Sequence, residues 1–244
     1  MRFVLGLLPA VLLMTAEPSL AQRKNEQALF DAPQETLIVK LPASAQTQNL
    51  PASVTCVYYP GFLVKQVDIG EKGAESLAIV PVAAQKPPCE LSLPGEVHMQ
   101  DWRGYFLGVK GSFVFFDADD GFNGGVPFAV FPAQGATGGN KLIEDSRKSF
   151  EAVELEGTDL VLRYDRVLSL DCSLQMEKTC WIKAQAVTGL PEDRKPDCGD
   201  AYAKNAPDSP DVPSVLSYPA ELRLTASEWK ISVRRGDVAC YPAN

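Results

Sequence analysis

The chain has 244 residues, of which 45% are hydrophobic and 22% charged, and its formal net charge at pH 7 is −8. This acidity argues against nucleic acid and anionic membrane surfaces as main partners, because both carry negative charge. The length suits one large β domain or two small ones, since β-sandwiches often reach about 200 residues as a single unit.

Residues 1–21 have the layout of a secretory signal peptide. Arg2 supplies the positive end, an apolar stretch follows, and cleavage is expected between Ala21 and Gln22. The apolar stretch of about 14 residues is shorter than the ~20 that a membrane-spanning helix needs, which favours cleavage over an anchor. We therefore expect a periplasmic or extracellular protein. Its mature chain, residues 22–244, is predicted to be a single β domain without a transmembrane segment.

The N-terminal half of the mature chain predicts short strands after a loosely ordered segment at residues 22–35. Short runs of apolar and β-branched residues bounded by turn residues are typical of strands. Four such runs follow one another: Thr36–Leu41, Val54–Tyr59, Phe62–Ile69 and Leu77–Val82. We expect them to form a block of strands.

His98 is the only histidine of the chain. It could act as a base or orient a nucleophile, with Asp101 close by, because catalytic triads are dispersed in sequence. No G-x-S-x-G motif accompanies it. The alternative is a surface or capping residue at a strand end.

Trp102 and Tyr105, with Phe106 beside them, could form an aromatic platform for a sugar or a protein loop. The alternative is that Tyr105 and Phe106 begin a strand and that Trp102 covers the edge of a sheet.

The middle of the chain contains two continuous apolar runs, Phe113–Phe116 and Val126–Phe131. Runs without alternation predict strands that are covered on both faces, hence the centre of the structure. The loop Asp117–Gly125 joins them. Its Phe122, flanked by Gly121 and Asn123, is expected to be either a buried plug or an exposed anchor for a partner.

This loop also carries oxygen ligands of the kind that calcium prefers, which are Asp117, Asp119, Asp120 and Asn123. An EF-hand is excluded, because Phe122 takes the place of the required glycine and Phe128 that of the required glutamate. A hairpin connection, in which Asp, Asn and Gly adopt turn conformations, is the alternative. A third hypothesis is a hydrolase that uses two of the aspartates as acid and base.

The clearest alternation spans Leu160–Leu174, and a second run follows at Cys180–Ala186. We predict that these two segments form an antiparallel hairpin, with Leu170 opposite Ile182. Residues 191–213, rich in Pro and Asp, predict an irregular surface excursion with at most one helical turn around residues 200–204. A further hairpin is predicted to join residues 220–224 to residues 229–233.

All six cysteines follow the signal peptide, and an even number in an exported chain predicts disulfides. The spacing lacks the close pairs that a zinc site needs. We expect these pairs: Cys56 with Cys89, Cys172 with Cys180, and Cys198 with Cys240.

Together these patterns predict an antiparallel β-sandwich of roughly a dozen strands held by disulfides, with propeller-like sheets as the alternative. The leading functional hypothesis is a non-enzymatic module that binds a protein or carbohydrate partner through the segment around Trp102 and Tyr105 and through Phe122. The alternatives are a cation-dependent or carboxylate hydrolase centred on Asp117–Gly125, and a structural envelope protein with a calcium-stabilised loop. No cofactor other than calcium is expected.

Overall fold

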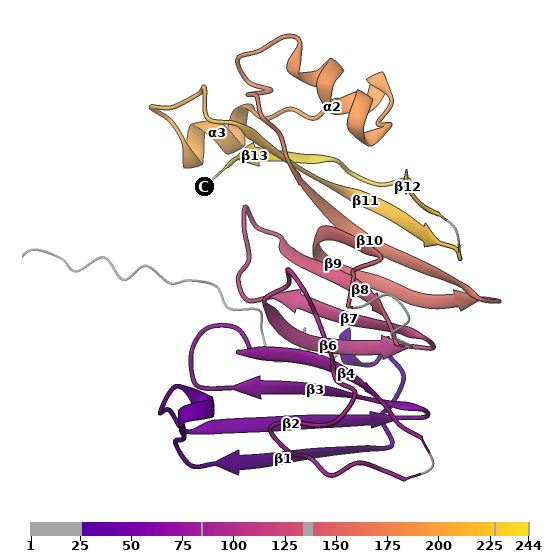
Figure 1. Cartoon of the computed structure of the whole chain (residues 1–244). Helices are drawn as coiled ribbons and strands as arrows, with labels where there is room; N and C mark the ends of the chain where they lie inside the picture. The colour runs from indigo at the N-terminus through magenta and orange to yellow at the C-terminus, as the bar shows by residue number, and fades with distance from the viewer. Residues whose placement is uncertain (1–25, 84, 134–138, 227, 244) are drawn as a thin grey trace, which may run out of the picture.

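The computed structural model describes residues 26–83, 85–133, 139–226 and 228–243, so the predicted signal peptide lies outside the described residues. Two antiparallel sheets form the described chain, one with the strand order β1-β2-β3-β4-β5 and one with the order β12-β11-β10-β9-β8-β7-β6 and β13 beside β11. Figure 1 shows the strands following one another in chain order, with helices α2 and α3 at the far end from β1. The predicted antiparallel, sandwich-like all-β fold is confirmed.

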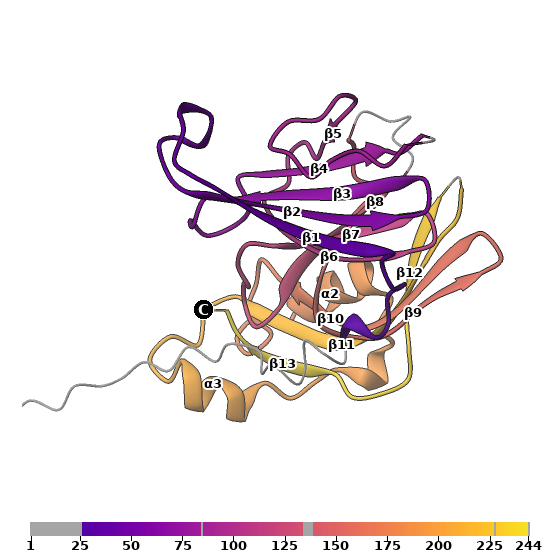
Figure 2. The same cartoon turned by 90° about the horizontal axis from the view of Figure 1, so that it is seen from below.

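The five-stranded sheet is built from hairpins between neighbouring strands, as the N-terminal pattern predicts. Its strands are β1 (Glu35–Leu41), β2 (Ala52–Tyr59), β3 (Phe62–Asp68), β4 (Ser76–Pro81) and β5 (Val97–His98), with a 3-10 helix, η1 (Ala45–Thr47), between β1 and β2. One face packs on the other sheet, and Figure 2 shows the two sheets overlapping there. The other face is covered by residues 85–96, which the Cys56–Cys89 disulfide ties to β2.

The eight-stranded sheet contains the two continuous apolar runs in two adjacent strands near one of its edges. Its strands are β6 (Gly104–Lys110), β7 (Phe113–Ala118), β8 (Val126–Pro132), β9 (Ile143–Glu156), β10 (Asp159–Ser169), β11 (Ser214–Leu224), β12 (Trp229–Val233) and β13 (Ala239–Pro242). Phe115 and Phe128 face the core on the helix side, whereas Phe116 and Phe131 face the five-stranded sheet. All four are fully buried, so both runs are covered on both faces as predicted.

The segment after β10 corrects one prediction. Residues Cys180–Thr188 form helix α2 and not the second strand of a hairpin, and β10 pairs with β9 and β11 instead. The buried residues of α2 recur at a helical spacing, and Ile182 is 65% exposed where the hairpin would have buried it. The alanines of this segment favour a helix, and a run this short fits either period. The Cys172–Cys180 disulfide is present as predicted, but it joins the turn after β10 to the start of α2.

The predicted last hairpin and the Cys198–Cys240 disulfide agree with the structure, whereas the Pro-rich excursion contains more helix than the single turn predicted. The hairpin β11–β12 pairs Ala220 with Val233 and Leu222 with Ile231. The Pro-rich excursion contains the short helices η2 (Glu192–Arg194) and α3 (Gly199–Asn205), and the predicted Cys198–Cys240 disulfide holds it to β13. No helix of the described residues is long and apolar enough to cross a membrane.

Residues 26–34 are docked on the eight-stranded sheet, where the sequence predicted a loosely ordered segment. The Phe30 ring centroid lies 5.1 Å from that of Phe115, and Gly108 leaves room for the ring because a Cβ there would lie 2.3 Å from it. Glu26 accepts a 3.0 Å hydrogen bond from the backbone N–H of Phe150 and pairs with buried Arg147. These partners are far away in sequence, so no local pattern reveals the docking.

Candidate functional site

The Asp117–Gly125 loop between β7 and β8 closes with a tight turn. Phe122 and Gly125 exchange backbone hydrogen bonds of 2.7 and 3.0 Å. The two residues between them, Asn123 and Gly124, have φ angles of 50° and 71°. Positive φ at both central positions is what two-residue hairpin turns require, and Asn-Gly is their preferred sequence. The loop therefore has the hairpin geometry that its Asp, Asn and Gly content favours.

Two of the four side chains considered as calcium ligands point into the protein. Asp117 lies 3.0 Å from the guanidinium of Arg147, which is only 2% exposed. Asn123, also buried, donates a 2.7 Å hydrogen bond to the hydroxyl of Ser169. These contacts hold the two ends of the loop against β9 and β10.

The other two side chains lie at the surface and contact a different part of the chain. Asp120 pairs with Lys72, and the hydrogen bond from Lys72, together with its positive charge, lowers the pKa of the Asp120 carboxyl. Asp119 packs beside Gly73, where a Cβ would come within 2.9 Å of it. Among the described residues no three acidic, histidine or cysteine side chains converge as a metal site. Calcium binding stays a prediction that this geometry does not favour.

Phe122, at the tip of the loop, is 63% exposed. The neighbouring residue holds the turn in place, because the backbone carbonyl of Asn123 accepts a 3.0 Å hydrogen bond from the hydroxyl of Tyr241. Gly125 lets the loop approach closely, since a Cβ there would lie 2.5 Å from the Ser146 hydroxyl and 2.8 Å from Val167. An exposed phenyl ring is thus held on a well-ordered support.

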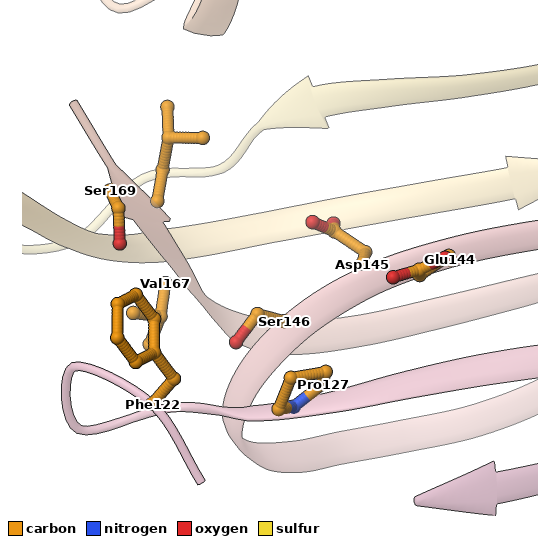
Figure 3. Close-up of a pocket in the computed structure, with 8 residues that line it drawn as sticks. Phe122, Pro127, Glu144, Asp145, Ser146, Val167 and Ser169 are labelled. Atoms are coloured by element: carbon orange, nitrogen blue, oxygen red, sulfur yellow. The ribbon is translucent and has the colours of Figure 1, made fainter. Parts of the chain in front are cut away.

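Phe122 borders an open pocket of about 390 Å³. Three neighbouring strands, β8, β9 and β10, supply the rest of its lining, which consists of Pro127, Glu144, Asp145, Ser146, Val167, Leu168 and Ser169. Figure 3 shows the Phe122 ring beside Val167 and Ser169 at one end, with Asp145 and Glu144 at the other. The pocket therefore joins an aromatic surface to carboxylate and hydroxyl groups.

The carboxylate of Asp145 belongs to a buried hydrogen-bond network. The Nε of Arg166 lies 3.1 and 2.9 Å from its two oxygens, and the hydroxyl of Tyr164 donates to one of them. Arg166 also donates a 2.9 Å hydrogen bond to the hydroxyl of Tyr218. Burial raises the pKa of both tyrosines, so both phenols remain protonated. Burial opposes the charge of Arg166, but Asp145, Tyr218 and Tyr164 together outweigh it, and the pKa of the guanidinium is raised.

The structure places Trp102 and Tyr105 away from this pocket. Trp102 packs, partly buried, against the core between the sheets. The hydroxyl of Tyr105 accepts a 2.7 Å hydrogen bond from the backbone N–H of Gly73, and Phe106 packs edge-on against Phe116. Neither Trp102 nor Tyr105 lines the pocket beside Phe122, and a common contact surface of these aromatics with Phe122 stays a prediction.

His98 contacts Ser76 and Glu96. Its Nδ1 lies 3.1 Å from the Ser76 hydroxyl, and its Nε2 lies 3.1 Å from a carboxylate oxygen of Glu96. Sequence reasoning singled out His98 but neither partner. The only local signal is the Glu-Val-His spacing, which puts Glu96 two residues before His98.

Sequence reasoning also missed Asp145, Ser146 and Ser169 as neighbours of Phe122. No local motif marks them, because they reach Phe122 only through the pairing of β8 with β9 and of β9 with β10.

Comparison of the chain with protein-family models, with curated proteins and with solved structures found no match.

Proposed function

We propose that this protein is an exported binding module and that the pocket beside Phe122 is its recognition site. The observation that carries the proposal is the exposed phenyl ring, which a hydrogen-bonded turn holds at the edge of a polar pocket. A rigid aromatic side chain loses little conformational entropy on binding, which makes it an effective anchor for a ligand.

The lining of the pocket favours a carbohydrate as the ligand. A sugar ring has an apolar C–H face and a rim of hydroxyl groups. The Phe122 ring would contact the apolar face, while Glu144, Ser146 and Ser169 would accept hydrogen bonds from the hydroxyls. The volume of about 390 Å³ falls in the range of roughly 300–1,000 Å³ that small-ligand sites occupy.

Export is part of the proposal. The three disulfides support it, because such bonds persist in the periplasm and outside the cell but are rare in the reducing cytoplasm.

The alternative functions centred on the loop gain less support from the geometry. The aspartates at positions 117, 119 and 120 have separate neighbours, so no two of them face each other as an acid and base pair would. A protein partner is the second candidate, because the exposed Phe122 could equally fill an apolar pocket on another protein.

The test is a glycan array, followed by titration calorimetry with the best glycan, on the wild type and on Phe122→Ala. The matched control is Ile182→Ala, which removes an equally exposed apolar side chain from α2. We expect Phe122→Ala to weaken binding at least about tenfold and the control to leave it unchanged. Equal binding by Phe122→Ala would show that the site is elsewhere. Glycan-independent capture of an envelope protein that only Phe122→Ala abolishes would identify a protein partner instead.

A further inference from the structure

A polar cluster lies on the outer face of the five-stranded sheet, apart from the Phe122 pocket. β5 pairs with β4 so that His98 stands opposite Ala78. Side chains alternate along a strand, which puts Ser76, two residues before Ala78, on the same face as His98. This register brings the Ser76 hydroxyl to 3.1 Å from Nδ1 of His98. The His98 side chain is 58% exposed, so the pair is open to solvent.

The carboxylate of Glu96 completes the cluster and is itself held in place. One of its oxygens accepts hydrogen bonds from the ammonium of Lys65 and from the backbone N–H of Leu93. The other oxygen lies 3.1 Å from Nε2 of His98. Glu96 is 8% exposed and Lys65 1% exposed, so a buried positive charge balances the carboxylate.

This connectivity assigns a role to each group. A carboxylate beside Nε2 favours the tautomer that carries its proton on Nε2, which leaves the lone pair of Nδ1 for the Ser76 hydroxyl proton. The two ring nitrogens are exchanged relative to the usual serine, histidine and carboxylate triad, but the order of the three groups is the same. We propose that Ser76 is a nucleophile for acyl transfer from small esters, with His98 as its general base and Glu96 as the positioning residue.

The reaction would proceed in two steps, acylation of Ser76 and hydrolysis of the acyl-serine. The Ser76 oxygen bonds to the ester carbonyl carbon while its proton moves to Nδ1 of His98. The ester C–O bond then breaks, and the leaving alcohol takes that proton. Water repeats the sequence on the acyl-serine, with His98 again accepting and returning a proton, so that a carboxylic acid leaves and Ser76 is regenerated.

The first test combines a fluorophosphonate probe, which bonds to an activated serine with loss of fluoride, with hydrolysis of p-nitrophenyl acetate by the full, oxidised protein. Ser76→Ala should abolish labelling. His98→Gln should lower both labelling and hydrolysis by about 100-fold, the lower end of the usual contribution of a general base. The matched control is Ser232→Ala, which removes an exposed hydroxyl that donates a 3.4 Å hydrogen bond to the backbone carbonyl of Glu221. This control should label and hydrolyse like the wild type.

A test of the role of Glu96 requires a variant that still folds. Glu96→Gln alone leaves the Lys65 ammonium buried without a counter-charge, so Lys65→Met is combined with it. The chain has one histidine, and therefore its ¹⁵N NMR signals report the tautomer of His98 alone. We expect the Nε2–H tautomer in the wild type, and a mixture of tautomers with slower labelling in the double variant.

Three results would overturn the proposal. One is a wild type that the probe does not label under conditions that label a known serine hydrolase. Another is a label on a serine other than Ser76. The third is hydrolysis that persists in Ser76→Ala and disappears in His98→Gln, since the imidazole would then act without the serine.

Discussion

Each of the two sheets has a carboxylate that is 8% exposed and paired with a cation, Asp145 in one and Glu96 in the other, and the two pairs are completed differently. In the eight-stranded sheet, both oxygens of Asp145 face Arg166, and the remaining donor, Tyr164, is also buried. In the five-stranded sheet, Lys65 occupies one oxygen of Glu96, and the other oxygen faces the exposed His98.

The difference distinguishes the Asp145 network, which supports the fold, from the Glu96 pair, which orients an exposed imidazole. Buried charges need partners, and a network that satisfies all of its members internally gives rigidity to its surroundings. The Asp145 network is of this kind, and Asp145 itself lines the Phe122 pocket. A buried carboxylate that uses one oxygen on a solvent-exposed imidazole can instead set the orientation and tautomer of that imidazole.

The largest effect is expected from breaking the Lys65–Glu96 pair. Lys65→Met leaves a buried carboxylate without its counter-charge, and we expect the free energy of unfolding to fall by about 4 kcal/mol. Adding Glu96→Gln should recover most of this loss, because no buried charge then remains. Urea denaturation measures the free energy of unfolding of the single and of the double variant. A loss below about 1 kcal/mol for Lys65→Met would mean that water reaches Glu96.

Breaking the pair in the other sheet should cost somewhat less. Asp145→Asn leaves the Arg166 guanidinium without a counter-charge, but this side chain is 15% exposed, so we expect a loss of about 3 kcal/mol. The neighbouring Glu144→Gln changes an exposed carboxylate and should alter stability by less than about 0.5 kcal/mol. Similar losses for the two variants in urea denaturation would contradict the supporting role of Asp145.

Removing a single hydroxyl from each of the two clusters tests the same comparison with a smaller expected effect. Tyr164→Phe removes one hydrogen bond to the buried Asp145 carboxylate and should destabilise the fold by about 2 kcal/mol. Ser76→Ala removes a hydroxyl at the open surface and should cost less than about 0.5 kcal/mol. Thermal and urea unfolding of the two variants test this contrast, and a larger loss for Ser76→Ala would make the Ser76 cluster the structural one.

A last difference is a dependence of stability on alkaline pH. Burial raises the pKa of Tyr164 and Tyr218, and burial with the charge of Asp31 raises the pKa of Tyr59 to about 12. Unfolded tyrosine has a pKa of about 10, so the stability these groups contribute is complete below about pH 10 and declines at higher pH. Each tyrosine contributes at most ~1.4 kcal/mol per pH unit to the decline. Urea titrations across this range should show a shallower decline for Tyr218→Phe and an unchanged one for Ser76→Ala.

The sequence by itself determined the features that depend on neighbouring residues. The continuous runs Phe113–Phe116 and Val126–Phe131 predicted strands buried on both faces, and the alternation in residues 220–233 predicted the last hairpin. All three predicted disulfides are present, although the sequence predicts the Cys172–Cys180 pair within a hairpin that the structure does not form. These predictions succeed because side-chain periodicity and turn preferences are properties of a local stretch of chain.

Only the tertiary structure decided the rest. The segment Cys180–Thr188 is a helix because its buried side chains meet the sheet at a helical spacing, which a short sequence cannot distinguish from a strand. The docking of Glu26 on Arg147, the pocket around Phe122 and the approach of Ser76 to His98 all join residues that are distant in sequence. Strand pairing and sheet packing bring them together, and local patterns contain no information about which distant groups then become neighbours.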